Sequence, residues 1–188
     1  MTILGALMGL FFLSGGIGAL PAYAVAPMAS AIPNYLVTLT AYNAVEAQTD
    51  SDPFVTASGI YSNPEIVAAR SRDLADELSF GTIIEVDGTN ASKEACGYDI
   101  VAPIIGYRIV ADTMSARYAD RVDILFSTKS NYTLKDGKVK NAGVVLGICS
   151  GVTIRVVGHI DLTHTQKLPK TQIELAAIVN GSNELALK

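Results

Sequence analysis

Short strand-like segments, separated by polar or glycine-containing turns, run through most of the chain and limit its fold more than any other feature. Asp87-Gly88 and Asp136-Gly137 are turn signals, and the second lies at the tip of a hairpin predicted over 131–141. Strand-like segments occur at 35–42, 81–88, 106–113, 121–127 and 151–161. Several short strands with regular turn signals predict a compact, mostly antiparallel β barrel or sandwich.

Two parts of the chain permit either a helix or a strand. Residues 63–78 have a partly helical texture, and Pro64 suits a helix start. Within them, the segment 66–70, "IVAAR", can instead form a further strand. The tail 162–188, a C-terminal extension, can add a terminal helix or strand.

The first 32 residues form an apolar leader. No charged residue occurs between Ile3 and Ala24, and the triplet Ala22-Tyr23-Ala24 resembles the cleavage site of a secretory signal. No Lys or Arg precedes Ile3, however, and the apolar run continues far enough to span a bilayer if it is not cleaved. We therefore expect an exported protein of the cell envelope, periplasmic or extracellular. Residues 1–32 are then either a signal peptide or a membrane anchor.

The charge, cysteines and histidines of the chain argue against a nucleic-acid partner and a metal site and allow one disulfide. The formal net charge is −4 and no block of Lys and Arg is present, so we expect no nucleic-acid partner. In an oxidising compartment Cys96 and Cys149 can pair, closing a loop of about fifty residues. Their spacing fits no zinc site. His159 and His164 share no face of a helix or strand and favour a surface or capping role, so we expect no metal.

Two aspartates carry the functional signal. Asp112 closes the strand-like segment 106–113, and Asp123 interrupts the apolar run of the next one, between Val122 and Ile124. If these two neighbours face the core, alternation places Asp123 on the opposite face of the strand. There it is either a solvated outward acid or an acid that lines a groove, with its pKa raised by partly apolar surroundings.

These segments resemble the three-aspartate (3D) domain of the double-psi β-barrel superfamily. The similarity rests on "VTLTAY", "TDSDPFVTASG", "FGTII", "YRIVADTM", "RYADRVDILF" and "GVTIRVV", and it covers roughly residues 36–157. The superfamily includes membrane-bound lytic transglycosylase A, stationary-phase survival proteins and expansins. The resemblance implies a six-stranded double-psi β-barrel with short helical connections over 35–161.

The resemblance also implies roles for individual residues. Asp123 matches the catalytic aspartate of the transglycosylases, and Asp112 the supporting acid. Asp73 is only an approximate match for the family's remaining aspartate. Met114 stands where the family usually has glycine, which puts close substrate approach there in doubt. An insertion over 128–143 separates the Asp123 strand from the segment that follows.

Lytic transglycosylases cleave a sugar–sugar bond without water. The C6 hydroxyl of the muramic acid attacks its own anomeric carbon, and this intramolecular attack needs no second carboxylate to activate water. Asp123 would first protonate the leaving oxygen and then accept the hydroxyl proton, which requires a raised pKa. Asp112 would raise that pKa as a nearby like charge, or orient Asp123. The chemistry needs no cofactor.

A glycan groove also needs polar groups on its opposite wall. Asp50 and Asp52 are either part of this wall or turn-forming residues whose side chains bond the backbone. Tyr42 is placed to stack on a sugar ring. The predicted binding residues are Thr40, Tyr42, Asp50, Thr56, Ser58, Gly59 and Thr113.

These observations predict a monomeric, exported enzyme that cleaves the glycan strands of peptidoglycan. The rival is a wall-binding module similar to expansins, which keeps the groove but lacks the chemistry. A third possibility is a secreted signalling or structural barrel without a glycan ligand. The third would be favoured if Asp112 and Asp123 lay on different faces of the fold.

Overall fold

The structure is a computed structural model that describes residues 32–49 and 52–186. Nearly all of the predicted leader, and Asp50, lie outside the described residues. None of the helices within the described ranges has both the length and the hydrophobicity needed to cross a bilayer.

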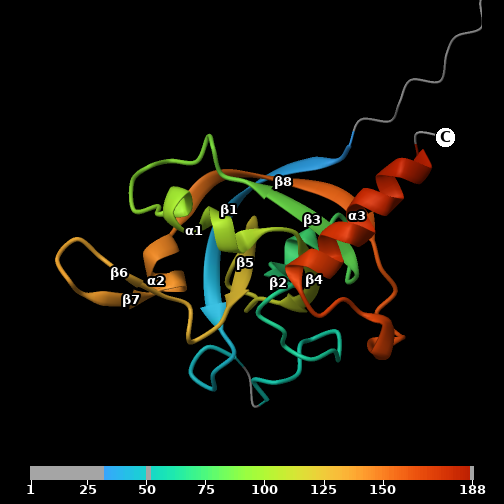
Figure 1. Ribbon diagram of the computed structural model, residues 1–188, viewed down its shortest axis with the longest axis horizontal. Coiled ribbons are helices and arrows are strands. Elements are labelled where there is room, and N and C mark those ends of the chain that lie inside the picture. The colour runs from blue at the N-terminus through green and yellow to red at the C-terminus, as the bar shows by residue number, and fades with distance from the viewer. Residues whose placement is uncertain (1–31, 50–51, 187–188) are drawn as a thin grey trace, which may run out of the picture. The chain divides into compact units, whose positions relative to one another are not determined.

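Six strands of the described chain close a barrel (Figure 1). Their order around it is β1-β5-β2-β4-β3-β8. The predicted mostly-β fold with a closed six-stranded barrel is therefore confirmed. The strands are β1 (Asn34–Asn43), β2 (Val67–Arg70), β3 (Thr82–Asp87), β4 (Arg108–Thr113), β5 (Arg121–Phe126) and β8 (Cys149–His159).

The barrel mixes parallel and antiparallel pairs. Strands β1 and β5 are parallel, as are β2 and β4, and the other neighbours are antiparallel. The pairing scheme is unchanged when β1, β2 and β3 are exchanged for β4, β5 and β8, so the chain has a topological pseudo-symmetry. This arrangement is compatible with a double-psi barrel.

Short helices and one hairpin connect the strands. The segment 63–78 forms strand β2 and a single 3-10 turn, η1 (Arg72–Leu74), so the strand alternative for 66–70 is the correct one. All four residues of β2 are buried, so both faces of this strand are covered. The remaining elements are α1 (Tyr98–Ile105), β6 (Asn131–Thr133), β7 (Val139–Asn141), α2 (Ala142–Leu146), η2 (Thr165–Lys167) and α3 (Gln172–Ala186).

The apolar residues form two core clusters. One draws side chains from all six barrel strands and from α1 and α2. In the other, the fully buried Leu175 and Val179 of α3 pack with residues of the barrel strands. Helix α3 of the C-terminal extension thus contributes apolar side chains to the core, whereas its Ile173 is 83% exposed.

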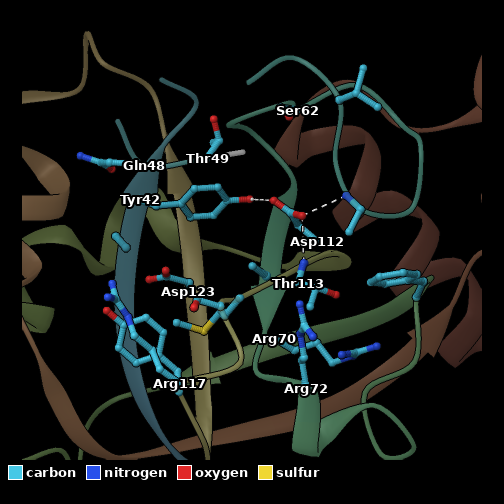
Figure 2. A pocket seen from close by; sticks show the side chains of 18 of the residues that line it. Tyr42, Gln48, Thr49, Ser62, Arg70, Arg72, Asp112, Thr113, Arg117 and Asp123 are labelled. Carbon is cyan, nitrogen blue, oxygen red and sulfur yellow. Dashed lines mark hydrogen bonds between the residues drawn. The ribbon is translucent and has the colours of Figure 1, made fainter. Parts of the chain in front are cut away.

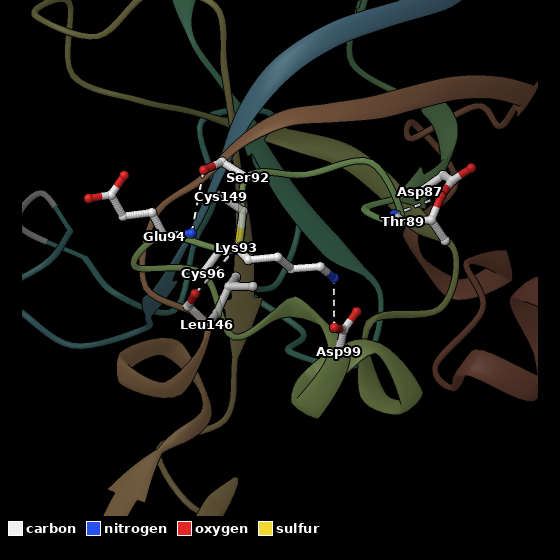
Figure 3. A network of polar contacts seen from close by, with 9 residues as sticks. All are labelled: Asp87, Thr89, Ser92, Lys93, Glu94, Cys96, Asp99, Leu146 and Cys149. Carbon is white, nitrogen blue, oxygen red and sulfur yellow. Dashed lines mark hydrogen bonds and ion pairs between the residues drawn. A yellow bond between two sulfur atoms is a disulfide. The ribbon is translucent and has the colours of Figure 1, made fainter.

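A disulfide between Cys96 and Cys149 ties the segment before α1 to the start of β8 (Figure 3). Backbone hydrogen bonds from Ile148 to Ala95 and from Gly97 to Leu146 reinforce the junction. Gly147 has a φ of +66°, and a Cβ there would lie 2.4 Å from the Ala95 carbonyl oxygen. Only glycine fits this close crossing.

Arg108 is the largest fully buried side chain, with only 1% of its surface exposed. Its guanidinium donates to the carbonyls of Ile104 and Ile105 at 2.8 and 2.6 Å, which end helix α1 without helical partners. It also donates to Pro64 at 2.6 Å and Leu125 at 3.2 Å. Burial lowers the pKa of Arg108 to about 10. One side chain thereby joins α1, β4, β5 and the connection before β2.

Removing the disulfide should destabilise the fold strongly. The two cysteines are 53 residues apart, and the chain-entropy estimate for such a loop is about 4 kcal/mol. We expect a Cys96→Ala/Cys149→Ala variant to lose about 3 to 4 kcal/mol of unfolding free energy in urea denaturation. Wild-type protein unfolded with and without reductant provides the second measurement. Equal midpoints in both experiments would contradict the prediction.

Replacing Arg108 by lysine keeps the charge but removes the planar fork of donors. The carbonyls of Pro64, Ile104, Ile105 and Leu125 then each lose a donor, and we expect a loss of roughly 2 to 4 kcal/mol in the same assay. Arg155→Lys is the matched control, because Arg155 forms ion pairs with Glu85 and Asp87 at the surface. Its loss should stay below about 1 kcal/mol. Similar losses for both variants would show that the buried hydrogen bonds of Arg108 contribute no more to the unfolding free energy than the surface ion pairs of Arg155.

Candidate functional site

Four neighbouring strands align a short row of residues across the barrel wall. Thr40 of β1 is paired with Asp123 of β5, Asp123 with Ala69 of β2, and Ala69 with Asp112 of β4. The two predicted acids therefore flank one alanine, whose small side chain leaves space between them. The register shifts between Ala68 and Ala69, and this irregularity sets Asp112 opposite Ala69.

Asp123 is a partly buried carboxylate with one short hydrogen bond. The Thr40 hydroxyl donates to its Oδ1 at 2.6 Å. Burial raises the pKa of Asp123 to about 6, and the nearby Asp112 adds a smaller increase. The Thr40 hydrogen bond and the charge of Arg121 act in the opposite direction. The expected raised pKa is present, with desolvation rather than Asp112 as its main cause.

Asp112 is engaged by three donors. Its Oδ2 accepts the Tyr42 hydroxyl at 2.8 Å, and its Oδ1 accepts the backbone N–H groups of Ala57 at 2.9 Å and Thr113 at 2.8 Å. Asp112 thereby joins β1 and β4 to the loop that contains Ala57. Burial, followed by the charge of Asp112, raises the pKa of Tyr42, which keeps the phenol protonated as a donor.

Both acids line one large groove, with a volume of about 1030 Å³ (Figure 2). Asp112 and Asp123 therefore do not lie on separate faces of the fold. Of the other predicted residues, Tyr42 and Thr113 line the groove, and Thr40 contacts it through its bond to Asp123. Further lining comes from Ala41, Ala47, Gln48, Thr49, Ala69, Ala75, Phe80, Met114, Ser115 and Tyr118.

The loop after β1 contributes to the groove through other residues than predicted. The buried Thr56 bonds the Ile60 carbonyl and the Ser58 hydroxyl, and Gly59 has a φ of +86° at the tip of this turn. Thr56, Ser58 and Gly59 shape the loop, and the groove is lined instead by Val55, Ala57 and Ser62. Thr56, Ser58 and Gly59 are not among the lining residues, so their predicted contact with a glycan stays a prediction.

Asp52 accepts the backbone N–H of Phe54 at 2.9 Å. It is therefore a turn-forming residue of the kind expected from its sequence context. Asp50 lies outside the described residues.

Asp73 stands outside the groove lining and holds a connection in place. Its carboxylate accepts the backbone N–H of Asp120 at 2.8 Å, next to the start of β5. Asp120 has a φ of +51°, a conformation that Asp adopts more readily than most residues. Met114 is buried in the second core cluster, and its backbone N–H donates to the Arg70 carbonyl at 2.9 Å.

Three arginines line the groove and were not anticipated from the sequence. Arg70 ends β2, Arg72 begins η1, and Arg117 lies in the connection between β4 and β5. The available signal was their position, because each lies at or just beyond the end of a strand that leads into the site. Arg70 and Arg72 lie in the segment 63–78, whose partly helical pattern left open whether a strand ends there.

No group of three or more His, Cys, Asp or Glu side chains in the described ranges is arranged to hold a metal ion. Comparisons with protein-family models and with curated proteins find no match for this chain. The chemistry of the groove is therefore inferred from its own residues.

The raised pKa of Asp123 makes stability depend on pH. Between its ordinary value of 3.8 and about 6, the folded state keeps a proton that the unfolded state has released. The folded protein should lose roughly 3 kcal/mol as pH rises through this range. Asp123→Asn does not titrate, so its unfolding free energy should gain about that much relative to wild type between pH 4 and pH 8.

Asp87→Asn is the control for this experiment. Hydrogen bonds from Thr89 and the charge of Arg155 lower the pKa of Asp87, so its contribution to stability changes only below the ordinary value. Its difference from wild type should be nearly constant between pH 4 and pH 8. A constant difference for Asp123→Asn as well would show that Asp123 is not desolvated. Urea denaturation at each pH supplies the measurement.

Proposed function

We propose that this protein cleaves the glycan strands of peptidoglycan without water, as lytic transglycosylases do, with Asp123 as the acid and base. The observation that carries this proposal is a carboxyl group with a pKa of about 6 that lines a large groove. A pKa near neutrality lets one group donate and then accept a proton. The closed barrel and the paired acids support assignment to the 3D domain, and the apolar leader supports export to the cell envelope.

The proposed reaction begins with protonated Asp123. Its proton passes to the glycosidic oxygen as the bond from that oxygen to the anomeric carbon breaks. The C6 hydroxyl of the same muramic acid forms a new bond to the anomeric carbon, and its proton passes to the Asp123 carboxylate. Asp123 regains its starting state, no water is consumed, and the products are a free hydroxyl end and a 1,6-anhydro end.

The surroundings of Asp123 suit this double role. Thr40 donates to Oδ1, and this bond fixes the carboxyl group in one orientation. The Oδ2 atom is the one that would exchange the proton with substrate. Desolvation by the groove wall keeps the acid protonated to a higher pH than usual.

Asp112 is a positioning residue in this proposal. Its carboxylate already accepts three hydrogen bonds, which leaves it poorly placed to transfer protons. It holds Tyr42 on one wall and the backbone of Ala57 on the other, so it sets the width of the groove beside Asp123.

A glycan-binding module without catalysis is the second candidate. It is favoured by Met114, whose buried side chain lines the groove at a position where the 3D domain usually has glycine. Such a module would bind wall material and release no product.

Asp123→Asn should abolish cleavage without unfolding the protein. Amide replaces carboxyl at the same size, so neither proton transfer can occur, and we expect a loss of at least about 100-fold. Purified peptidoglycan is digested with protein that lacks residues 1–32, and anhydromuropeptides are counted by mass spectrometry. The structure describes the barrel from residue 32 onward, and circular dichroism would verify that this form folds.

Asp99→Asn is the matched control, because Asp99 is exposed on α1 and paired with Lys93 at 2.7 Å, away from the groove. It should retain wild-type release. If the wild type releases no anhydro product under conditions where a known transglycosylase does, the catalytic proposal fails and the binding module is favoured. If Asp123→Asn keeps its activity, Asp123 is not the acid.

A further inference from the structure

The groove brings three guanidinium groups close to the two acids. Arg70, Arg72 and Arg117 all line it, although the chain as a whole carries a net charge of −4. In Figure 2, Arg70 and Arg72 lie below Asp112 and Thr113, and Arg117 lies below Asp123. A groove for a neutral sugar chain alone has no need of three cations.

Arg70 is the most constrained of the three. It is 92% buried, with Nε donating to the Leu78 carbonyl at 2.9 Å, Nη1 donating to Ser71 at 3.3 Å, and the guanidinium stacked on Phe80 at 5.0 Å. Within the described residues, no carboxylate lies within 4.0 Å of it, and its Nη2 has no hydrogen-bond partner. Burial lowers the pKa of Arg70, and the charges of Asp73 and Asp76 act in the opposite direction without forming an ion pair. Because no buried side-chain polar atom in the described residues lacks a partner, the unpartnered Nη2 is accessible from the groove. An anion that enters the groove can accept a charge-assisted hydrogen bond from it.

Arg117 and Arg72 extend this positive region. The Arg117 guanidinium lies over the Tyr118 ring at 4.8 Å from the ring centre, and Arg121 packs against the same ring at 4.9 Å. Among the described side chains, neither Arg72 nor Arg117 has an ion-pair partner. Both are exposed at the groove and available to a ligand.

The acids of the groove do not neutralise these arginines. The oxygens of Asp112 accept Tyr42, Ala57 and Thr113, and Asp123 accepts Thr40. No ion pair joins either acid to a guanidinium within the described part of the chain. The three cations are therefore arranged for something other than an internal salt bridge.

We propose that Arg70, Arg72 and Arg117 form a carboxylate-binding subsite, which selects glycan strands that carry acidic substituents. A planar guanidinium binds a carboxylate through two parallel hydrogen bonds, so it recognises this group better than a hydroxyl or an amide. Peptidoglycan presents such groups as the carboxylates of the peptides attached to its muramic acids. The inference rests on the proposed function and adds the feature of the substrate that the groove reads.

The test measures binding rather than cleavage, in the Asp123→Asn background. Insoluble peptidoglycan is prepared in two forms, untreated and with its carboxyl groups converted to neutral amides, and chitin serves as a neutral glycan. We expect binding to the untreated wall to exceed binding to the other two by about tenfold or more in a sedimentation assay.

Arg72→Gln/Arg117→Gln should remove most of that preference, lowering affinity for the untreated wall by about tenfold and leaving binding to chitin unchanged. Arg70→Lys keeps the charge but loses the fork, and should weaken binding in the same selective way. Lys129→Gln/Lys140→Gln is the control, since it removes the same charge from exposed positions outside the groove. The control should bind like the parent.

Three results would overturn the subsite: equal binding to the untreated and amidated walls, equal losses in the groove and control variants, or no binding to the wall. The outcome is separate from catalysis. Carboxylate-selective binding by a protein that releases no anhydro product would retain the subsite and reject the enzyme. Release of anhydro product by a protein that shows no preference for carboxylates would retain the enzyme and reject the subsite.

Discussion

The pairing of strand β2 with β5 on one edge and β4 on the other is the constraint on which the site depends. Asp123 and Asp112 enter from different strands, and β2 sets their spacing by pairing Ala69 with both. Without the register shift after Ala68, Ala69 would lie opposite Ala111, and Asp112 would move one position along the strand. One irregularity in a four-residue strand therefore decides that the two acids share a groove.

Strand β2 is too short to hold this register by its own hydrogen bonds, so the surrounding contacts must hold it. Arg108 joins the carbonyl of Pro64, just before β2, to β5 and the end of α1. On the other side, the Ser71 backbone N–H donates to the Arg121 carbonyl at 2.9 Å, and the Arg121 N–H donates to the Ser71 hydroxyl at 3.0 Å. This support offsets the cost of keeping Asp123 desolvated beside the groove.

The sequence was sufficient for features that depend on local pattern. Alternation and turn residues located five of the six barrel strands and the hairpin, and Asp123 stood out as an acid within an apolar run. Strand β2 was ambiguous because a strand buried on both faces has no alternation to distinguish it from a helix. The burial of Thr56 and the position of Arg70, Arg72 and Arg117 in one groove depend on contacts between segments that are distant in the sequence. Residue spacing does not encode such contacts. Whether the groove binds glycan remains a prediction from the resemblance.

The arginines and the buried acid place opposite demands on one groove. Positive charge near Asp123 lowers its pKa, as Arg121 does, whereas the proposed reaction needs the proton retained. Burial outweighs that effect in the free protein. In the proposed complex, carboxylates on the substrate would neutralise Arg70, Arg72 and Arg117. The bound glycan would also exclude water from Asp123. Both changes favour the protonated acid, so the ligand that the cations select would also set the protonation state that cleavage requires.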